Sequence, residues 1–150
     1  MAPNNPVVAH FMDGTILKGT TQDFAPTRAH FHIIPSGASR GQQVRLAQLK
    51  AVFFVRKLDG DPDRSDLRGF ITAPPQGVHG RKIAVRFADA ELLCGYAQSY
   101  SMSRDGFFIF PADAGSNNQR VFVITANAAE ICEGDSAEAL AQRILDSAAA

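Results

Sequence analysis

Three arginines, Arg28, Arg104 and Arg120, are the side chains best suited to bind an anion. A guanidinium keeps its positive charge at physiological pH and presents a planar fork of donors that matches phosphate or carboxylate oxygens. The sequence has no run of Lys and Arg that would form the basic stripe of a nucleic-acid-binding surface. These arginines therefore suggest a site for a small anion or a nucleotide.

A polar loop at residues 113–120 is the second candidate site. Asp113, Asn117 and Asn118, together with Arg120, offer both donors and acceptors to a peptide or to the edge of a nucleotide. Asn side chains in loops also satisfy neighbouring backbone groups in Asx turns. Both interpretations stay open from the sequence.

The sequence places no nucleophile beside a base. Nucleophilic catalysis needs a Cys or Ser near a His, but three of the four His precede residue 58 and both Cys follow residue 80. His30 and His32 lie two residues apart on one expected strand face, whereas Cys94 and Cys132 lack the spacing of zinc ligands. We therefore expect buried free thiols, no catalytic residue, no metal site and no cofactor, and a protein that is not an enzyme.

An internal repeat organises the chain. Residues 7–38 recur 76 positions later with ten identities and no gap, which predicts two copies of one structural unit. Arg28 falls on Arg104 and Gly19 on Gly95. The loop at residues 113–119 is expected to be one residue longer than its counterpart, which moves the alignment to 77 positions beyond it.

Hydrophobic alternation predicts five short strands in each copy. Gly19 and Gly95 mark sharp bends in the second strand of each copy, and Asp13-Gly14 predicts a hairpin turn. A small set of bent strands commonly closes into a barrel, because closure removes exposed edges. The strands are expected at residues 7–12, 15–24, 29–35, 43–47 and 51–57, and at residues 82–88, 91–100, 106–110, 120–124 and 129–133.

The expected fold is thus mainly β, with two tandem five-stranded barrels related by internal duplication and one C-terminal α-helix. The first barrel takes residues 1–57, a linker takes 58–80, the second barrel takes 81–134 and the helix takes 135–150. In the linker, residues 67–72 are a candidate extra strand. Its four aspartates, at positions 59, 61, 63 and 66, are expected as solvated turn residues, with a weak divalent-cation site as the alternative. Asp135 and Glu138 match a capping box at the start of the helix.

The aromatic residues predict a contact between the two barrels. Residues 52–55 are apolar on both faces of their strand, and a strand buried on both sides needs a second layer. Phe108 and Phe110 point opposite to the inward side chains of their own strand. We expect Phe54, Phe108 and Phe110 to form an interface between the barrels or with another subunit.

Charge and hydropathy limit the partners. The net charge is zero, but residues 1–57 carry +5, residues 58–80 carry −2 and residues 81–150 carry −3. The basic first copy is expected to face the acidic second copy, with attraction of an external anion as the alternative. No apolar run is long enough for a membrane span, and the start of the chain lacks the pattern of a signal peptide. We expect a cytoplasmic protein without membrane contact.

The element order in each copy resembles the Sm-like barrel, which is itself similar to the SH3-like barrel. The resembling features are Asp13-Gly14 after strand one, the bend at Gly19 before Asp23-Phe24, and a short turn between strands four and five. This resemblance implies RNA binding by the loops at residues 24–28 and 48–50, the second of which contains Lys50. Both loops lack the Asn and Arg-Gly elements of that family.

The whole chain also resembles an uncharacterised bacterial family. The resembling strings are Leu-Lys-Ala-Val-Phe-Phe-Val at residues 49–55, Pro-Ala-Asp at 111–113 and Ser-Asn-Asn at 116–118. Some members occur beside PilZ domains, which bind cyclic di-GMP. The PilZ pattern is matched in part by the Ser and Gly of residues 101–106, whereas Arg81 and Arg86 are spaced one residue too far apart.

These observations predict a non-enzymatic binding or scaffolding module that acts through protein–protein contacts or self-association. Strand edges and the Phe-rich faces would contact the partner. The alternatives are a small-anion or nucleotide binder, including a PilZ-like binder of cyclic di-GMP, and an Sm-like RNA binder. The candidate binding residues are Arg28, Lys50, Arg104, Asp113, Asn117, Asn118 and Arg120.

Overall fold

Over the residues that the structure describes, the fold is mainly β, with ten strands, two short 3-10 turns and one C-terminal helix. The computed structural model describes residues 5–58, 60, 69–70, 80–98, 100–101, 104–113 and 115–149. The first five strands are β1 (Asn5–Phe11), β2 (Ile16–Thr21), β3 (His30–Pro35), β4 (Gln42–Arg45) and β5 (Leu49–Val55), with the turn η1 (Leu46–Gln48) before β5. The second five are β6 (Arg81–Phe87), β7 (Leu92–Ala97), β8 (Gly106–Pro111), β9 (Asn118–Ile124) and β10 (Ala128–Glu133), with η2 (Thr125–Asn127) before β10 and α1 (Asp135–Ala149) after it.

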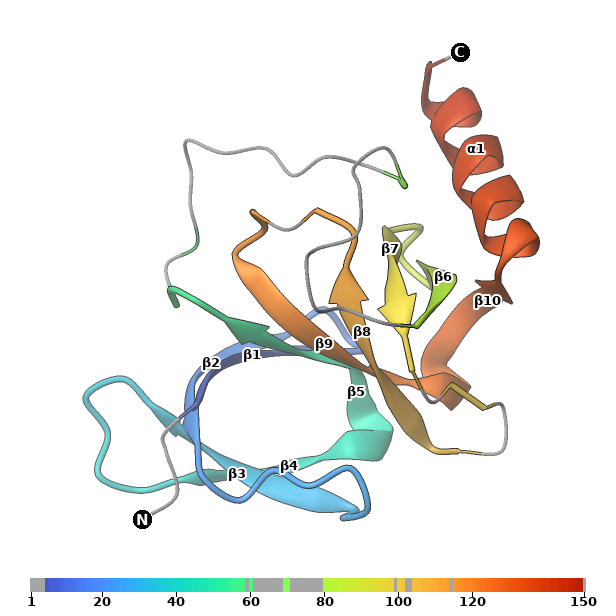
Figure 1. The fold of residues 1–150 in the computed structure, drawn as a ribbon. Coiled ribbons are helices and arrows are strands. Elements are labelled where there is room, and N and C mark those ends of the chain that lie inside the picture. Colours follow the sequence, from blue (N-terminus) through green and yellow to red (C-terminus); the bar gives the residue numbers. More distant parts are fainter. Residues whose placement is uncertain are drawn as a thin grey trace.

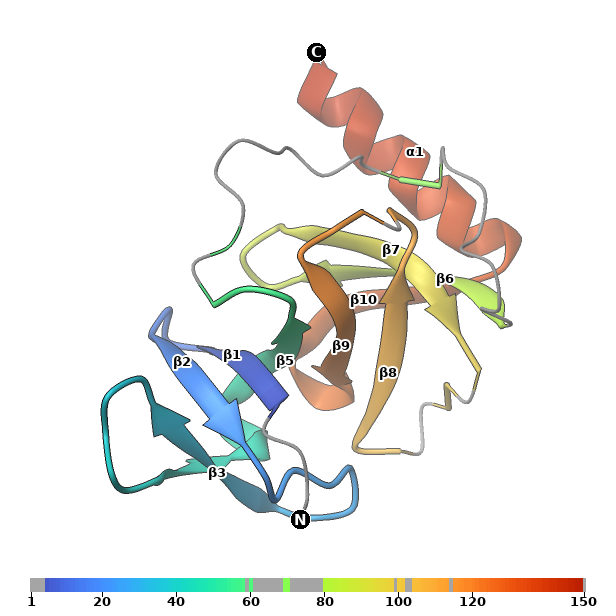
Figure 2. The ribbon, with the colours of Figure 1, turned by 60° about the vertical axis from the view of Figure 1, so that its left-hand side comes forward.

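All ten strands belong to one antiparallel sheet, in the order β10-β6-β7-β8-β9-β5-β1-β2-β3-β4. The predicted pair of closed barrels is therefore wrong in its closure. Each set of five strands curls strongly (Figures 1 and 2), but β4 does not pair with β5. Instead β5 pairs with β9, which joins the two curled units edge to edge.

The reason lies in the composition of β5, whose seven residues are all buried. Val52 and Phe54 pack in the core of the first unit, whereas Ala51 and Phe53 pack in the core of the second. A strand that is apolar on both faces needs cover on both, and the core of the second unit, joined to β5 through the ladder with β9, covers the second face. The prediction of a second layer over residues 52–55 is confirmed, but the two units share a sheet rather than stack as separate barrels.

The register of the strands repeats as the sequence repeat predicts. Val7 pairs with Gly19 in the first unit, and Ile83 pairs with Gly95 in the second, which is an offset of 76. Beyond the third strand the offset changes: Val44 pairs with Phe31, and Val123 pairs with Phe107. The offset of 79 there corrects the expected 77: β3 and β4 are separated by as many residues as β8 and β9, but β9 begins three residues before Val121, the position equivalent to Gln42 at the start of β4.

Gly19 and Gly95 mark the sharp bends that the sequence predicts. A Cβ on Gly19 would lie 2.3 Å from the carbonyl oxygen of Ile34, and one on Gly95 would lie 2.2 Å from that of Phe110. No side chain fits at such a distance, so the second strand of each unit needs glycine where the third strand crosses it.

The C-terminal helix packs on the outer face of the second unit, opposite its curled interior (Figure 2). Ala137, Leu140 and Ala141 contact Ala84 and Tyr96 in one buried cluster. The predicted capping box is wrong. The amides of Ala137 and Glu138 donate to the carbonyl of Gly134 and not to the side chain of Asp135. The carboxylate of Glu138 pairs with Lys82.

Two parts of the sequence-based reading fall outside the described residues. The candidate strand at 67–72 is described only at residues 69–70, and the four aspartates of the linker are all outside the described part. Among the described helices, none combines the length and the apolar character that crossing a membrane requires.

The first prediction concerns the two hairpin turns, in which glycine at position 14 corresponds to alanine at position 90. Gly14 has φ +93°, and its counterpart Ala90 has φ +73°, a region in which Cβ crowds the backbone. We expect Ala90→Gly to raise the free energy of unfolding by about 0.5–1 kcal/mol, since relief of strain exceeds the entropy that glycine adds to the unfolded chain. Urea unfolding measures the change.

The matched control is Gly14→Ala. A Cβ at Gly14 has no atom within 4 Å, so the loss of about 1 kcal/mol expected there would arise from the backbone alone. If Ala90→Gly destabilised the protein, the left-handed conformation at residue 90 would not be a source of strain.

Candidate functional site

A cleft of about 740 Å³ lies where the two units meet. Its walls come from equivalent segments of the two units, namely the loop before β3 and η1 of the first, and the loop before β8 and η2 of the second. The lining residues are Pro26, Thr27, Arg28, Ala29, Leu46, Ala47, Arg104, Asp105, Phe122, Ile124, Thr125, Ala126 and Asn127.

Arg28 and Arg104, which the repeat aligns, are held by the same backbone turn. The amide of Arg28 donates to the carbonyl of Ala25, and the amide of Arg104 donates to that of Ser101, each at 3.1 Å. The next residue in each loop then accepts a hydrogen bond from the turn before the last strand of its unit. These bonds run from Leu46 N to Ala29 O and from Thr125 N to Asp105 O, both at 3.0 Å.

The two guanidinium groups are available to a ligand. Arg28 and Arg104 are both exposed, and neither forms an ion pair with the residues that the structure describes. The carboxylate of Asp105, also on the cleft wall, likewise has no ion-pair partner there. The rim of the cleft thus carries two cations and one anion that the described protein leaves unneutralised.

The remaining wall is apolar and firmly supported. Phe122 is buried and packs edge-on against Phe24 and Phe108, with ring centroids 5.2 and 5.0 Å away. Asn127 donates from Nδ2 to the carbonyls of Ala47 at 2.9 Å and Leu49 at 2.7 Å, and so ties η2 of the second unit to η1 of the first. The Oγ1 atom of Thr125 is buried without a partner among the described residues.

Arg120 is not among the residues that line the cleft. Its guanidinium is stacked between Phe54 of β5 and Phe108 of β8, 4.4 and 4.6 Å from the ring centroids. Burial lowers the pKa of Arg120. This arrangement uses Arg120 as a cation–π contact between the two units.

Lys50 is buried between the units, with only 6 % of its side chain exposed. Its Nζ lies 2.8 Å from Asp89 Oδ2 and 3.1 Å from Glu91 Oε2, and 4.6 Å from the ring centroid of Phe87. The basic first copy and the acidic second copy therefore attract each other at this point, as one of the two charge interpretations predicts.

The polar loop before β9 satisfies backbone groups. Asp113 accepts a hydrogen bond from the amide of Gly115. Asn117 pairs with the backbone of Lys57 in both directions, accepting its N–H at 3.0 Å and donating to its carbonyl at 2.9 Å. The amide of Asn118 donates to Ser116 Oγ. The structure thus favours the turn interpretation of this loop, and it adds a tie from Asn117 to the end of β5.

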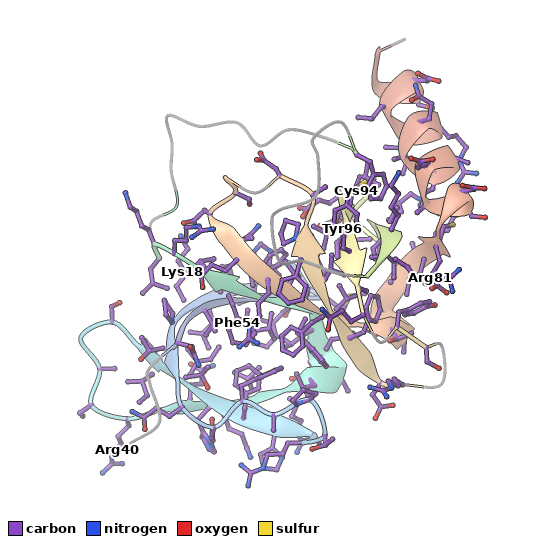
Figure 3. All side chains as sticks on the ribbon, in the orientation of Figure 1. Lys18, Arg40, Phe54, Arg81, Cys94 and Tyr96 are labelled. Atoms are coloured by element: carbon purple, nitrogen blue, oxygen red, sulfur yellow. The ribbon has the colours of Figure 1, made fainter. Side chains whose placement is uncertain are left out.

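Of the three phenylalanines expected at an interface, two meet inside the chain. The rings of Phe54 and Phe108 lie 5.8 Å apart, and Figure 3 shows Phe54 directed into the middle of the molecule. Phe110 pairs with Tyr96 across β7 and β8 and is half-buried. His30 and His32 both lie on β3. The Nδ1 of His32 is 2.7 Å from Asp23 Oδ2.

The described residues contain no cluster of three or more His, Cys, Asp and Glu side chains with the geometry of a metal site. Neither Cys94, which is buried, nor Cys132, which is half-buried, forms a disulfide. Burial raises the pKa of Cys132, and the neighbouring charge of Glu130 adds to this effect.

Sequence reasoning found the two arginines of the cleft but missed its other walls. Asp105, Phe122 and Asn127 carry no local signal of ligand binding, because their place in the cleft depends on the pairing of β5 with β9. The alignment of Arg28 with Arg104 was the available signal, and it does not reveal that both residues line one cavity.

Comparison with known proteins gives one match. A family model described as "Family of unknown function (DUF6982)" covers residues 3–133. Neither the curated proteins nor the solved structures include a significant match to this chain.

The second prediction concerns the buried ammonium of Lys50. Asp89→Asn combined with Glu91→Gln should lower the free energy of unfolding by about 1–3 kcal/mol, because it leaves a buried charge without a counter-ion. Lys50→Met should cost less, since it leaves two half-exposed carboxylates that water can solvate. Urea unfolding of both variants at neutral pH makes the comparison.

The same cluster predicts a pH dependence. The hydrogen bond from Lys50 holds the pKa of Asp89 below its usual value. The Asp89 carboxylate therefore stabilises the folded state fully above the unfolded-state pKa of about 4, and this stabilisation is lost as the pH falls through the lowered pKa. Lys50→Met should remove this part of the acid dependence; an unchanged pH profile in that variant would contradict the assignment.

Proposed function

The chain belongs to DUF6982, a family of unknown function, and we propose from its geometry that it is a non-enzymatic binding module for a phosphate-bearing ligand of nucleotide size. The observation that carries this proposal is the meeting of Arg28 and Arg104 at one cleft. Two equivalent loops, far apart in the sequence, present the same residue type to the same cavity.

The chemistry of the cleft supports a nucleotide over a bare anion. Its volume of about 740 Å³ lies within the range of about 300–1,000 Å³ usual for small-molecule sites. Arg28 and Arg104 would bind phosphate oxygens as bidentate donors. Phe122 and Ile124 supply an apolar wall for a base, and Asp105 supplies an acceptor for base N–H groups.

The third prediction tests this site with defined probes. We expect AMP, GMP or cyclic di-GMP to raise the melting temperature, because a ligand that binds the folded state stabilises it. Titration calorimetry should then show binding weakened roughly tenfold or more by Arg28→Ala and by Arg104→Ala, since each removes a charged contact to phosphate. Asp105→Asn should strengthen the binding of inorganic pyrophosphate, because it removes a like charge.

Arg40→Ala is the matched control. Arg40 is an exposed arginine on the loop between β3 and β4, at the outer end of the first unit in Figure 3, and its removal should leave affinity unchanged. Pyrophosphate that binds as well as the nucleotides would reduce the proposal to a simple anion site. No binding by any probe would exclude it, and binding by a uridine-rich oligonucleotide alone would favour the Sm-like alternative.

We further propose that the two units derive from one duplicated small barrel of Sm-like or SH3-like type. The repeated strand order and the constant offset of 76 through the first three strands support this origin. Pairing of β5 with β9 would then have replaced the closure of each barrel.

Protein–protein contact is the second candidate function. The Phe-rich faces expected to carry it are partly used within the chain, because Phe54 and Phe108 contact each other. Among the described strands, β4 and β10 each have one neighbour and so keep a free edge. A free edge can add a strand from a partner.

A further inference from the structure

The two units meet through a surface that has an equivalent elsewhere in the molecule. In the first unit, Val8 of β1 and Phe53 of β5 point away from their own core. They pack instead into the core of the second unit, beside Val85 and Phe107. The outer face of β1 and β5 is therefore the surface against which the second unit packs, while the edge of β5 pairs with β9.

The strand register identifies the equivalent surface on the second unit, which is the outer face of β6 and β10. Val8 pairs with Phe53, and Ala84 of β6 pairs with Cys132 of β10. Since Val8 and Ala84 are 76 positions apart, Cys132 takes the place of Phe53. Ala84 and Cys132 do not meet a third unit; they pack in the cluster that contains Leu140 of α1.

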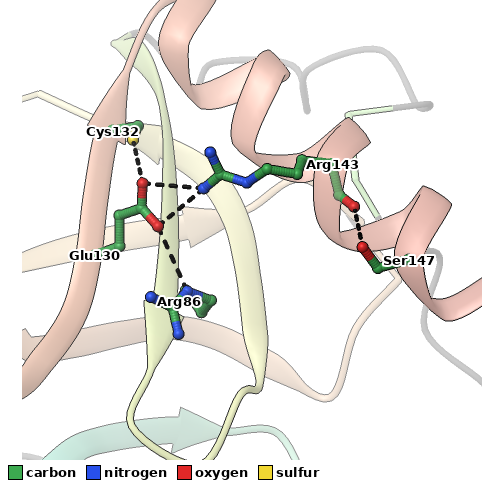
Figure 4. A network of polar contacts seen from close by, with 5 residues as sticks. All are labelled: Arg86, Glu130, Cys132, Arg143 and Ser147. Carbon is green, nitrogen blue, oxygen red and sulfur yellow. Dashed lines mark hydrogen bonds and ion pairs between the residues drawn. The ribbon is translucent and has the colours of Figure 1, made fainter.

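The helix is fixed there by ion pairs as well as by its apolar stripe. Arg143 donates from Nη2 to both carboxylate oxygens of Glu130 on β10, at 2.9 and 3.0 Å, and Arg86 joins the same carboxylate (Figure 4). Glu138 pairs with Lys82 of β6. The helix thus covers the place where a further unit would dock.

A unit able to dock exists in every other copy of this chain. The strand equivalent to β9 is β4, because Val44 and Val123 occupy matching register positions. Among the described strands, β4 and β10 each have one neighbour. An interface between unlike surfaces of one chain can repeat from copy to copy.

We infer that the outer face of β6 and β10 is a docking surface for the first unit of a second copy, and that α1 is a built-in cap that occupies it. The surface continues the established interface between the two units. Terminal caps limit repeat proteins in the same way, by covering the face on which the next repeat would stack.

The composition of β4 makes this contact weaker than the internal one. Gln42, Gln43 and Arg45 occupy the positions of Val121, Phe122 and Ile124. The pairing of β5 with β9 within one chain is also favoured by the linker, because the linker keeps these two strands at a high effective concentration. Release of α1 should therefore give association that depends on protein concentration.

The inferred register provides a sharp test. Phe53 pairs with Val121, so Cys132 of one copy should lie opposite Gln42 of the next. Directly opposed residues of antiparallel strands have Cα atoms about 4.5–5.5 Å apart, which suits a disulfide. We expect Gln42→Cys to form an intermolecular disulfide with Cys132 when α1 is released.

The helix is released in the full-length chain by Leu140→Asp, because Leu140 is 1 % exposed against the sheet. The matched control is Ala139→Asp, which puts the same charge on the exposed side of α1. With Gln42→Cys in both, oxidation with diamide should give at least about tenfold more linked dimers and longer species in the Leu140→Asp protein. Peptide mapping should find residues 42 and 132 joined.

Two further variants give every result a meaning. Gln43→Cys in the Leu140→Asp background should link poorly, because adjacent side chains of a strand point to opposite faces. If Leu140→Asp prevents folding, the double variant Glu138→Lys with Arg143→Glu is used in its place. It releases α1 by reversing the charge of one partner in each of its two ion pairs, and the same cross-linking measurement is made on it.

The inference is overturned if the folded, helix-released protein stays monomeric by light scattering and forms no 42–132 disulfide. It is also overturned if the Gln42→Cys and Gln43→Cys proteins link equally, since contact would then be unspecific. Equal linking in the Ala139→Asp control would show that α1 is no cap. Nucleotide binding plays no part in any of these outcomes.

Discussion

The pairing of β5 with β9 is the constraint on which the rest of the structure depends. Every residue of β5 is buried, and its side chains alternate between the core of the first unit and that of the second. Val121 and Phe122 of β9 divide between the same two cores. Neither unit can therefore complete its core alone, which explains why two short curled sets of strands form one sheet and do not close as barrels.

The same pairing creates the cleft and sets its chemistry. It brings η1 of the first unit against η2 of the second, where Asn127 bonds to the carbonyls of Ala47 and Leu49. The loops carrying Arg28 and Arg104 are brought to the same place, because each is hydrogen-bonded to the 3-10 turn of its own unit. Two copies of one loop thus come to face a common cavity, although each alone would present a single exposed arginine.

Much of the fold could be predicted from local pattern. The ten strands, the bends at Gly19 and Gly95 and the C-terminal helix follow from alternation, glycine placement and helical spacing, which are properties of neighbouring residues. The failures concern partners. A capping box was expected at Asp135, but the carbonyl of Gly134 begins the helix and Glu138 pairs with Lys82. The contacts of Lys50, a candidate binding residue, with Asp89 and Glu91 likewise join residues about forty positions apart and have no local signal.

By itself, the sequence determined that the protein is built from two equivalent units and that residues 52–55 need cover on both faces. It also determined that Arg28 and Arg104 are equivalent. Only the tertiary structure decided that the second unit supplies that cover through the pairing of β5 with β9. It also decided that Arg28 and Arg104 line one cleft while Arg120 stacks on Phe54, and that α1 covers the outer face of β10. The physical reason is that periodicity records which face of a strand is apolar, whereas the choice among apolar partners depends on the packing of segments about eighty residues apart.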